Sequence, residues 1–374
     1  MTTYDAVIIG GGVIGAAIAY YAAKRGQKVV LLEKDSLAAH SSRAAGGMLG
    51  AQVEFPEPGP LVELSLYSRT MFRELAVELQ QASGIDIGFN EAGMLRTAWT
   101  DEEKQTLLKQ ATWQRAAGLK ADWLETSDVR VLEPAVSSEI KGALSLPDDT
   151  QVSAPHLSRA FAVAAARLGA VLVERCAATN FRMKGFRIEA VQTNQGEFSG
   201  EQYIIAGGAW SGELTKLLGA PLSVFPLKGE AFSVLAVPQP ITHTVYSHGC
   251  YIVPKEGNRL LVGASVQDCG FDDRLSIGGL HQLMAKAVRL LPDIAAYPLE
   301  QTWASLRPQT ADGLPYLGRM ASVSNAIVAS GHFRNGILLS PATGEIVSRL
   351  LTGEAPGLDL SAFAPDRHQS IPAS

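Results

Sequence analysis

Three glycines near the start of the chain stand at a spacing that suits the pyrophosphate of a dinucleotide. Gly10, Gly12 and Gly15 form the pattern GxGxxG, and Glu33 follows where an acidic side chain accepts hydrogen bonds from ribose hydroxyls. The first glycine permits a tight turn, the second lets the backbone approach the phosphates, and the third lets a helix pack closely on a strand. Because GxGxxG alone is weak evidence, its meaning depends on the elements around it.

The segments that flank these glycines have the hydrophobic patterns that such a site requires. Residues 4–9 predict a buried strand, residues 13–25 a helix that ends at Gly26, and residues 28–33 a second buried strand. The result is a βαβ unit whose helix directs free N–H groups and a positive dipole end at the phosphates. Since Glu33 would repel a 2′-phosphate, the unit favours NAD or FAD over NADP.

A loop near the other end of the chain distinguishes these two dinucleotides. Residues 330–336 join a predicted strand to the last predicted helix, so their backbone N–H groups point at whatever lies in front of them. A flavin ring, which is negative at N1 and O2 when reduced, is a suitable occupant. No second GxGxxG follows a later strand, and we therefore expect one dinucleotide, FAD.

The remaining pattern predicts an α/β protein with interleaved domains. Further helices are expected at 61–81, from 101, near 128, and at 154–168, 277–291 and 335–351. Further strands are expected at 171–174, 186–191, 203–206, 224–226, 230–235, 251–254, 259–262, 303–306 and 326–329. We predict a discontinuous Rossmann-type FAD-binding domain of residues 1–85, 145–220 and 315–374. Residues 86–144 and 221–314 form a second, α+β substrate-binding domain on a mostly antiparallel sheet.

The composition argues against several classes of protein. The 374 residues are 47% hydrophobic and 18% charged, which is typical of a globular chain, and a net charge of −5 without basic runs disfavours nucleic acid as a partner. The three cysteines, Cys176, Cys250 and Cys269, lack CxxC spacing, so we predict no metal site and a reducing compartment. Without a signal peptide or a long apolar stretch, a cytoplasmic protein with no membrane partner is expected.

Several longer motifs resemble the D-amino-acid oxidase and sarcosine oxidase superfamily of flavoproteins. They are DAVIIGGGVIGAAIAY, SSRAAGGMLGA, YIIAGGAWSG, PLKGE, GCYIVPK, LRPQTADGLPYLG and GHFRNGILLSPATG, and they span Tyr4 to about Leu351. Within the superfamily the set is most similar to the glycine oxidases that feed the thiazole branch of thiamine synthesis. The resemblance implies a homotetramer, and it implies non-covalent FAD because residues 307–318 contain no cysteine for attachment.

The resemblance also implies the residues that contact the ligands. Beyond the glycine turn, those at the cofactor would be Val13, Ile14, Glu33, Lys34, Ser41, Ser42, Gly46, Gly47, Met48, Ala178 (through its backbone), His332, Phe333, Arg334, Asn335, Gly336, Ile337 and Leu338. Those at the substrate would be Arg307, Arg334 and Tyr251.

These substrate residues suit an amino acid. An Arg fork such as Arg307 offers two parallel charged hydrogen bonds to a carboxylate, although a surface ion pair is the alternative for an isolated Arg. The Tyr251 hydroxyl would donate to the same carboxylate, unless this residue is a core aromatic. The backbone carbonyl of Arg334 could accept a hydrogen bond from the substrate amine, and its side chain could tune the flavin or close the pocket. His332 is expected to be a structural hydrogen-bonding residue.

The expected reaction is oxidative deamination without a general base from the protein. A neutral amine would transfer its Cα hydrogen as hydride to flavin N5, water would hydrolyse the imine, and oxygen would reoxidise the flavin to give hydrogen peroxide. Glycine would yield glyoxylate and ammonia. The sequence leaves open the ranking of glycine, sarcosine, D-alanine and bulkier amines.

Two other functions are compatible with an FAD site. One is a D-amino-acid or sarcosine-type dehydrogenase that passes its electrons to an acceptor such as a membrane quinone. The net charge of −5 and the lack of a basic amphipathic helix disfavour that reading. The other is a non-catalytic FAD-binding module, in which Arg307 and Tyr251 would have no ligand.

Overall fold

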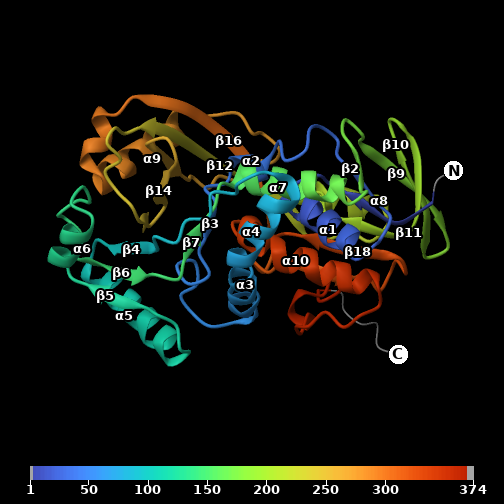
Figure 1. Ribbon diagram of the computed structural model, residues 1–374, viewed down its shortest axis with the longest axis horizontal. Coiled ribbons are helices and arrows are strands. Elements are labelled where there is room, and N and C mark those ends of the chain that lie inside the picture. The colour runs from blue at the N-terminus through green and yellow to red at the C-terminus, as the bar shows by residue number, and fades with distance from the viewer. Residues whose placement is uncertain (1–2, 369–374) are drawn as a thin grey trace.

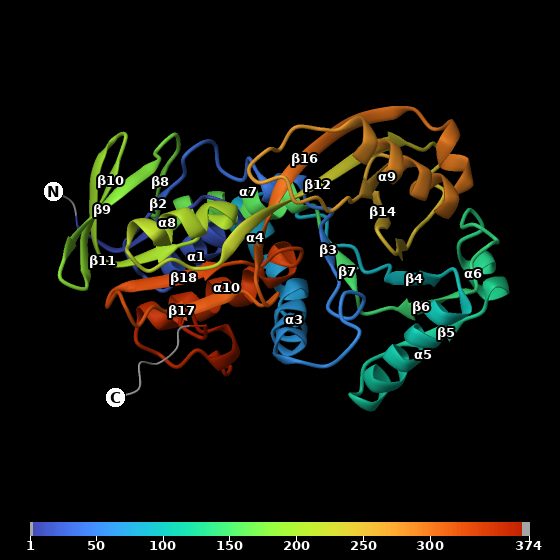
Figure 2. The ribbon, with the colours of Figure 1, turned by 180° about the vertical axis from the view of Figure 1, so that it is seen from behind.

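Two eight-stranded sheets lie side by side along the longest axis of the molecule in this computed structural model, which describes residues 3–368 (Figure 1). The first sheet lies with the helices of residues 13–24, 154–167 and 336–351, and the second lies at the opposite end with those of residues 101–116, 126–132 and 277–290 (Figures 1 and 2). None of the helices between residues 3 and 368 combines the length and apolar character needed to cross a membrane.

The first sheet is parallel at its centre, with the order β17-β18-β11-β1-β2-β8. Its strands are β1 (Thr3–Ile9), β2 (Val29–Leu32), β8 (Val171–Val173), β11 (Gly196–Ile205), β17 (Tyr316–Arg319) and β18 (Ala326–Ser330), and the antiparallel strands β9 (Ala178–Lys184) and β10 (Arg187–Thr193) extend from β11. The strands β18, β11, β1, β2 and β8 run in the same direction. Their carboxyl ends therefore meet at one edge, where open α/β sheets bind their ligands.

Helices cover one face of this sheet and short elements cover the other. The helical face holds α1 (Val13–Lys24), α3 (Pro60–Thr70), α4 (Phe72–Ser83), α7 (Ala154–Arg167) and α10 (Gly336–Leu351), with α1 packed between α7 and α10. The other face holds η1 (Gly208–Trp210) and α8 (Ser211–Leu217). Because side chains alternate along a strand, Ile8 and Leu31 enter the helical core whereas Val7 and Val30 enter the second core.

The second sheet is largely antiparallel, with the order β16-β12-β15-β14-β13-β4-β6-β5. Its strands are β4 (Met94–Ala98), β5 (Asp122–Leu124), β6 (Gly142–Leu146), β12 (Val224–Leu235), β13 (Thr244–Ser247), β14 (Cys250–Lys255), β15 (Arg259–Gly263) and β16 (Leu299–Thr310). Helices α6 (Thr126–Leu132), α9 (Ile277–Leu290) and η2 (Pro292–Ala296) cover one face, and α5 (Asp101–Ala116) packs on β4 and β6. Tyr246, Tyr251 and Val253 lie on the face away from α9, together with Met48 from the first half of the chain.

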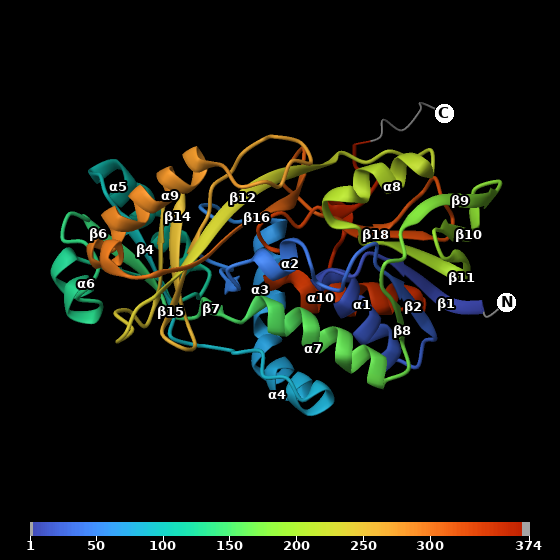
Figure 3. The ribbon, with the colours of Figure 1, turned by 90° about the horizontal axis from the view of Figure 1, so that it is seen from above.

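The paired strands β12 and β16 connect the two sheets. They pair from Val224 opposite Thr310 to Val234 opposite Leu299, and they run side by side from the centre of the molecule into the second sheet (Figure 3). Two short elements, α2 (Ser41–Ala44) and the two-stranded β3 (Met48–Leu49) and β7 (Thr150–Gln151), lie between the sheets. A final turn, η3 (Ser361–Phe363), follows α10.

The structure differs from the sequence prediction in several elements, among them one helix and the long strands that connect the two sheets. The helix expected at 61–81 is two helices that meet at Met71, where the Thr70 hydroxyl donates to the Tyr67 carbonyl, 2.7 Å away, and competes with the helical ladder. The strands expected at 224–226 and 230–235 are one strand, β12, and the strand expected at 303–306 extends over 299–310 as β16. The turn predicted at Gly257-Asn258 is present, with φ values of +75° and +57°.

Candidate functional site

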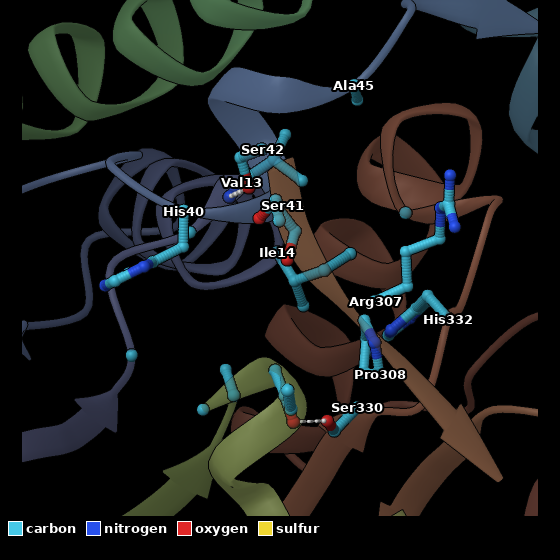
Figure 4. Close-up of a pocket in the computed structure, with 18 of the residues that line it drawn as sticks. Val13, Ile14, His40, Ser41, Ser42, Ala45, Arg307, Pro308, Ser330 and His332 are labelled. Carbon is cyan, nitrogen blue, oxygen red and sulfur yellow. Dashed lines mark hydrogen bonds between the residues drawn. The ribbon is translucent and has the colours of Figure 1, made fainter. Parts of the chain in front are cut away.

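A long cavity of about 340 Å³ begins at the carboxyl ends of the first sheet and reaches the inner face of the second. The turn after β1, the end of β2, the segments 38–48 and 206–210 and the loop 329–337 line one part of it. Gly229, Tyr251, Ala264 and Arg307 from the second sheet line the other part. Figure 4 shows residues from these distant segments around the same space, with Ser41 and Ser42 across from Arg307 and His332.

The glycine turn is built as the sequence pattern predicts. Gly10 has φ of +113°, a conformation that side chains rarely adopt, and it leads into α1. A Cβ on Gly15 would overlap the Gly10 carbonyl, so this glycine lets α1 pack against the turn. Gly12 is the extended residue before α1 and provides no side-chain cap, while the Val13 N–H donates to Ser42 Oγ, 2.8 Å away (Figure 4).

Glu33 supports this turn from the end of β2. The side chain is buried, and its Oε2 accepts from the Gly11 N–H, 2.7 Å away, while its Oε1 accepts from the Asp35 N–H, 2.9 Å away. Each carboxylate oxygen can accept two hydrogen bonds, so both can still receive a hydroxyl group from the cavity. Beyond it, Lys34 lies over the Trp210 ring, with its Nζ 4.2 Å from the ring centroid.

The group Glu33, Asp35 and His40 brings possible metal ligands within 4.8 Å of one another. The protein itself accounts for these side chains. Asp35 pairs with both Lys34 and His40, at 2.5 and 2.7 Å, and these two partners lower the pKa of Asp35. Glu33 accepts the backbone bonds described above.

The loop before α10 forms the opposite wall. The Phe333 N–H donates to the Pro308 carbonyl at 2.9 Å, and α10 begins after Asn335 without a side-chain cap, so its dipole faces the cavity. His332 Nε2 lies 3.1 Å from Thr343 Oγ1, and burial lowers the His332 pKa to about 3. His332 is therefore neutral at physiological pH. Ser330 donates to the Gly208 carbonyl and connects this loop to the start of η1 (Figure 4).

Arg307 and Tyr251 meet at the end of the cavity that the second sheet forms. Arg307 Nη1 donates to the Ser265 carbonyl at 3.0 Å, and burial lowers the Arg307 pKa. Burial raises the pKa of Tyr251, although Arg307 and Arg334 oppose this shift. A Cβ on Gly229 would overlap the Arg307 guanidinium, and one on Gly263 would overlap the Tyr251 hydroxyl. Two glycines thus leave the space that these polar groups occupy.

Most of the predicted site residues lie on the cavity wall. Those that do are Gly10, Gly12, Val13, Ile14, Glu33, Lys34, Ser41, Ser42, Gly46, Gly47, Met48, Ala178, Tyr251, Arg307, His332, Phe333, Arg334, Asn335, Gly336 and Ile337. Gly15 and Leu338 do not line it. Gly15 packs under the turn, and the Leu338 side chain is buried in the core around α10.

The sequence prediction missed four residues at the site. Glu54 lines the cavity and pairs with Arg334, and Tyr246 accepts from the same guanidinium at 3.0 Å. Trp210 lines the wall beside Lys34, and Lys255 donates to Gln151 and Val152 next to Gly47. Trp210 lies within a motif that carried the family resemblance and Lys255 ends another, which was a usable signal, whereas Glu54 lies three residues beyond such a motif.

The chain matches known proteins over nearly its whole length. The family model described as "FAD dependent oxidoreductase" matches residues 5–350. A glycine oxidase of Geobacillus kaustophilus is 44% identical over 367 residues, which are 98% of this chain and 97% of that protein. The crystal structure of glycine oxidase from Geobacillus kaustophilus matches with a TM-score of 0.96 at 43% identity, covering 99% of this chain and 100% of the other. A Synechocystis protein named bifunctional protein ThiO/ThiG is 32% identical, covering 98% of this chain and 54% of its own length.

Proposed function

Because this chain belongs to the family of FAD-dependent oxidoreductases, we propose that it oxidises glycine and related small amines such as sarcosine and D-alanine. The products are the 2-oxo acid, ammonia or an amine, and hydrogen peroxide. One observation carries the choice of substrate class. Arg307 is half-buried at the cavity wall and donates to a neutral carbonyl, and none of the carboxylates between residues 3 and 368 forms an ion pair with it.

The residues of the cavity fit FAD. The start of α1, where Gly12 has no side chain to cap the helix, suits a pyrophosphate, and the buried Glu33 carboxylate suits ribose hydroxyls. The start of α10, which has no side-chain cap, suits a ring that gains negative charge. When bound, FAD supplies an acceptor for two electrons and a hydrogen from the substrate. Residues 307–318 contain no cysteine, so we propose that FAD is held without a covalent bond.

The protein's own groups would bind and orient the amino acid. Arg307 would hold the carboxylate through two parallel hydrogen bonds, and Tyr251 would donate its hydroxyl proton to the same group. Both side chains are fixed by neighbours, which reduces the conformational entropy that they lose when the substrate binds. Burial strengthens these charged hydrogen bonds because little water competes for them.

We propose that no side chain acts as a general base. His332 lies on the cavity wall, and its pKa of about 3 makes its imidazole too weak a base to deprotonate an ammonium group. Its ring nitrogen is also engaged with Thr343. The substrate would therefore bind with a neutral amine, placed against the Arg334 backbone carbonyl.

The wider context is also a proposal. We propose a cytoplasmic homotetramer whose product serves thiamine synthesis. Its support is the family resemblance and the similarity to ThiO/ThiG proteins, whose name denotes two activities in one chain. We also propose that residues 1–85, 145–220 and 315–374 bind the cofactor while 86–144 and 221–314 bind the substrate, since the two sheets divide in this way.

The test is anaerobic mixing of the purified flavoprotein with glycine, sarcosine or D-alanine while flavin absorbance is followed, and then admission of air. Bleaching that air reverses, with one peroxide per substrate, supports an oxidase. Bleaching that only an added electron acceptor reverses would instead support a dehydrogenase. If none of the three amines bleaches the flavin, the proposed substrate class is wrong.

A further inference from the structure

The ion pair between Glu54 and Arg334 lies on the wall of the same cavity as Arg307. Glu54 Oε1 is 3.0 Å from Arg334 Nη2, and the two side chains are 12% and 23% exposed. The negative charge of Glu54 is the main cause that raises the Arg334 pKa, so Arg334 keeps its positive charge. Arg334 also donates to the Tyr246 hydroxyl, 3.0 Å away, which fixes its guanidinium beside the pair.

A buried polar network holds Glu54 in place. The Val53 N–H donates to the Asp149 carboxylate at 2.7 Å, and Arg69 pairs with that carboxylate at 2.7 Å. On the other side, Arg96 Nη1 donates to the Val53 carbonyl at 2.8 Å. Because both backbone groups of the residue before Glu54 are fixed, the Glu54 backbone is held at the cavity wall, and its carboxylate bonds to Arg334 from there.

The charged side chains on the wall at this end of the cavity sum to one net positive charge. Arg307 and Arg334 contribute two positive charges to the wall and Glu54 contributes one negative charge. Arg96 is also close to Glu54, but it lies behind Tyr246, bonds to the neutral Val53 carbonyl and Gln110 side chain, and does not line the cavity. A ligand with one carboxylate therefore neutralises the wall, and a second carboxylate would meet Glu54 instead of a free cation.

We propose that Glu54 is the residue that restricts the substrate to one negative charge, because it cancels Arg334 and leaves only Arg307 for a carboxylate. The identity of the substrate as an amine rests on the proposed function, whereas its number of carboxylates rests on this charge count. Glycine and D-alanine carry one carboxylate, and dicarboxylic amines such as iminodiacetate carry two. Glu54 thus excludes the second class without touching the reacting atoms.

The test uses the FAD-loaded protein and two inert anions, acetate and malonate, whose dissociation constants are read from the change in flavin absorbance. Glu54→Gln raises the excess charge by one and should raise the preference for malonate over acetate at least about tenfold, given the strength of a unit charge at this range. Arg334→Met lowers the excess charge by one and should move the preference the other way. The double variant restores the original charge and should return the preference to near its starting value.

Glu57→Gln is the matched control, because it removes the same charge from an exposed residue three positions away and should leave the preference unchanged. Glu54→Asp retains the charge and should retain the preference. A malonate preference that does not rise in Glu54→Gln and does not fall in Arg334→Met overturns the proposal, and either variant alone suffices if the other fails to fold. Since anion binding needs no turnover, failure to oxidise glycine would contradict the proposed function and leave this inference standing.

If the anion test succeeds, substrate specificity should follow it. The ratio of kcat/KM for iminodiacetate to that for glycine should rise in Glu54→Gln by a similar factor. Should Glu54→Gln instead lower kcat/KM for both amines equally with no change in the anion preference, Glu54 binds the amine and the charge-balancing role is wrong.

Discussion

The carboxylate of Glu33 accepts a hydrogen bond from the backbone N–H of Gly11, 2.7 Å away and 22 residues earlier in the chain. The end of β2 thus supports the turn after β1, and a single side chain connects the two halves of the dinucleotide site. A buried carboxylate in this position has two tasks, since it fixes the glycine turn and presents free acceptor positions to the cavity.

Glu33→Ala should weaken the retention of FAD. The variant loses the acceptor for the ribose and the support of the Gly11 N–H, and a hydrogen bond to a charged group contributes about 1.5–3 kcal/mol. We expect the dissociation constant for FAD to rise at least about tenfold, measured by the fluorescence of free flavin on dilution. Glu33→Gln keeps one acceptor oxygen, so its dissociation constant for FAD should lie between those of the original protein and of Glu33→Ala. Turnover of each variant after it has been refilled with FAD should change little. Retention of FAD at full strength in Glu33→Ala would contradict the ribose-binding role.

Arg307→Ala should abolish the recognition of carboxylates. Removal of one partner of a buried charged pair costs at least about 2 kcal/mol, so KM for glycine and the dissociation constant for acetate should both rise roughly thirtyfold or more. Arg307→Lys retains the charge but not the two parallel bonds, and should show an intermediate loss. FAD content should be unchanged in both variants. If acetate binds Arg307→Ala as well as it binds the original protein, the carboxylate lies elsewhere.

Gly229→Ala should have much the same effect without any change of charge. The added Cβ would occupy the space of the Arg307 guanidinium and displace it from the cavity wall. We expect weaker binding of glycine and acetate, at least about tenfold, with FAD still bound, as judged by titration of the holoenzyme. Gly278→Ala is the control, because no atom lies within 4 Å of a Cβ at that position in α9. Unchanged acetate binding in Gly229→Ala would mean that Arg307 can move at no cost.

His332 should make the stability of the protein fall in mild acid. Its pKa of about 3 in the folded state lies below its usual value of 6.5, so between these values only the unfolded chain binds the proton. The contribution of His332 to the free energy of unfolding is complete above pH 6.5 and is lost as the pH falls. The free energy of unfolding should drop by about 2 kcal/mol between pH 7 and pH 5 through this residue. Melting temperatures of the original protein and of His332→Gln, measured across this range, should therefore converge toward low pH. Parallel curves would show that His332 takes up its proton in the folded protein.

The dinucleotide end of the site was predictable because its signals are local. The GxGxxG turn, the strand before it and the helix after it occupy one short segment, and the φ of +113° at Gly10 is a requirement that only glycine meets readily. The same holds for the hairpin turn at Gly257-Asn258 and for the last helix, α10. In each case the residues that specify the element are also the residues that form it.

The substrate end was less predictable because its contacts join distant segments. Glu54 pairs with Arg334 across 280 residues, and no pattern around Glu54 indicates that its carboxylate is buried against a guanidinium. Strand lengths were underestimated for a related reason. In β11 and β16 most of the outer residues are polar or only partly buried, so the hydrophobic pattern marks only the central part of a ladder that backbone pairing extends.

The order of strands in the first sheet has a consequence for synthesis on the ribosome. β1 is made before β11, with which it pairs, and β11 in turn pairs with β18, which is made later still. At roughly 5–20 residues per second, β1 waits tens of seconds before β18 has been translated. The loop that closes the cofactor cavity follows β18, so FAD can bind stably only after β18 and this loop have been made. Cofactor capture thus comes after the synthesis of every strand of the first sheet, and until β18 is made one edge of β11 has no partner strand.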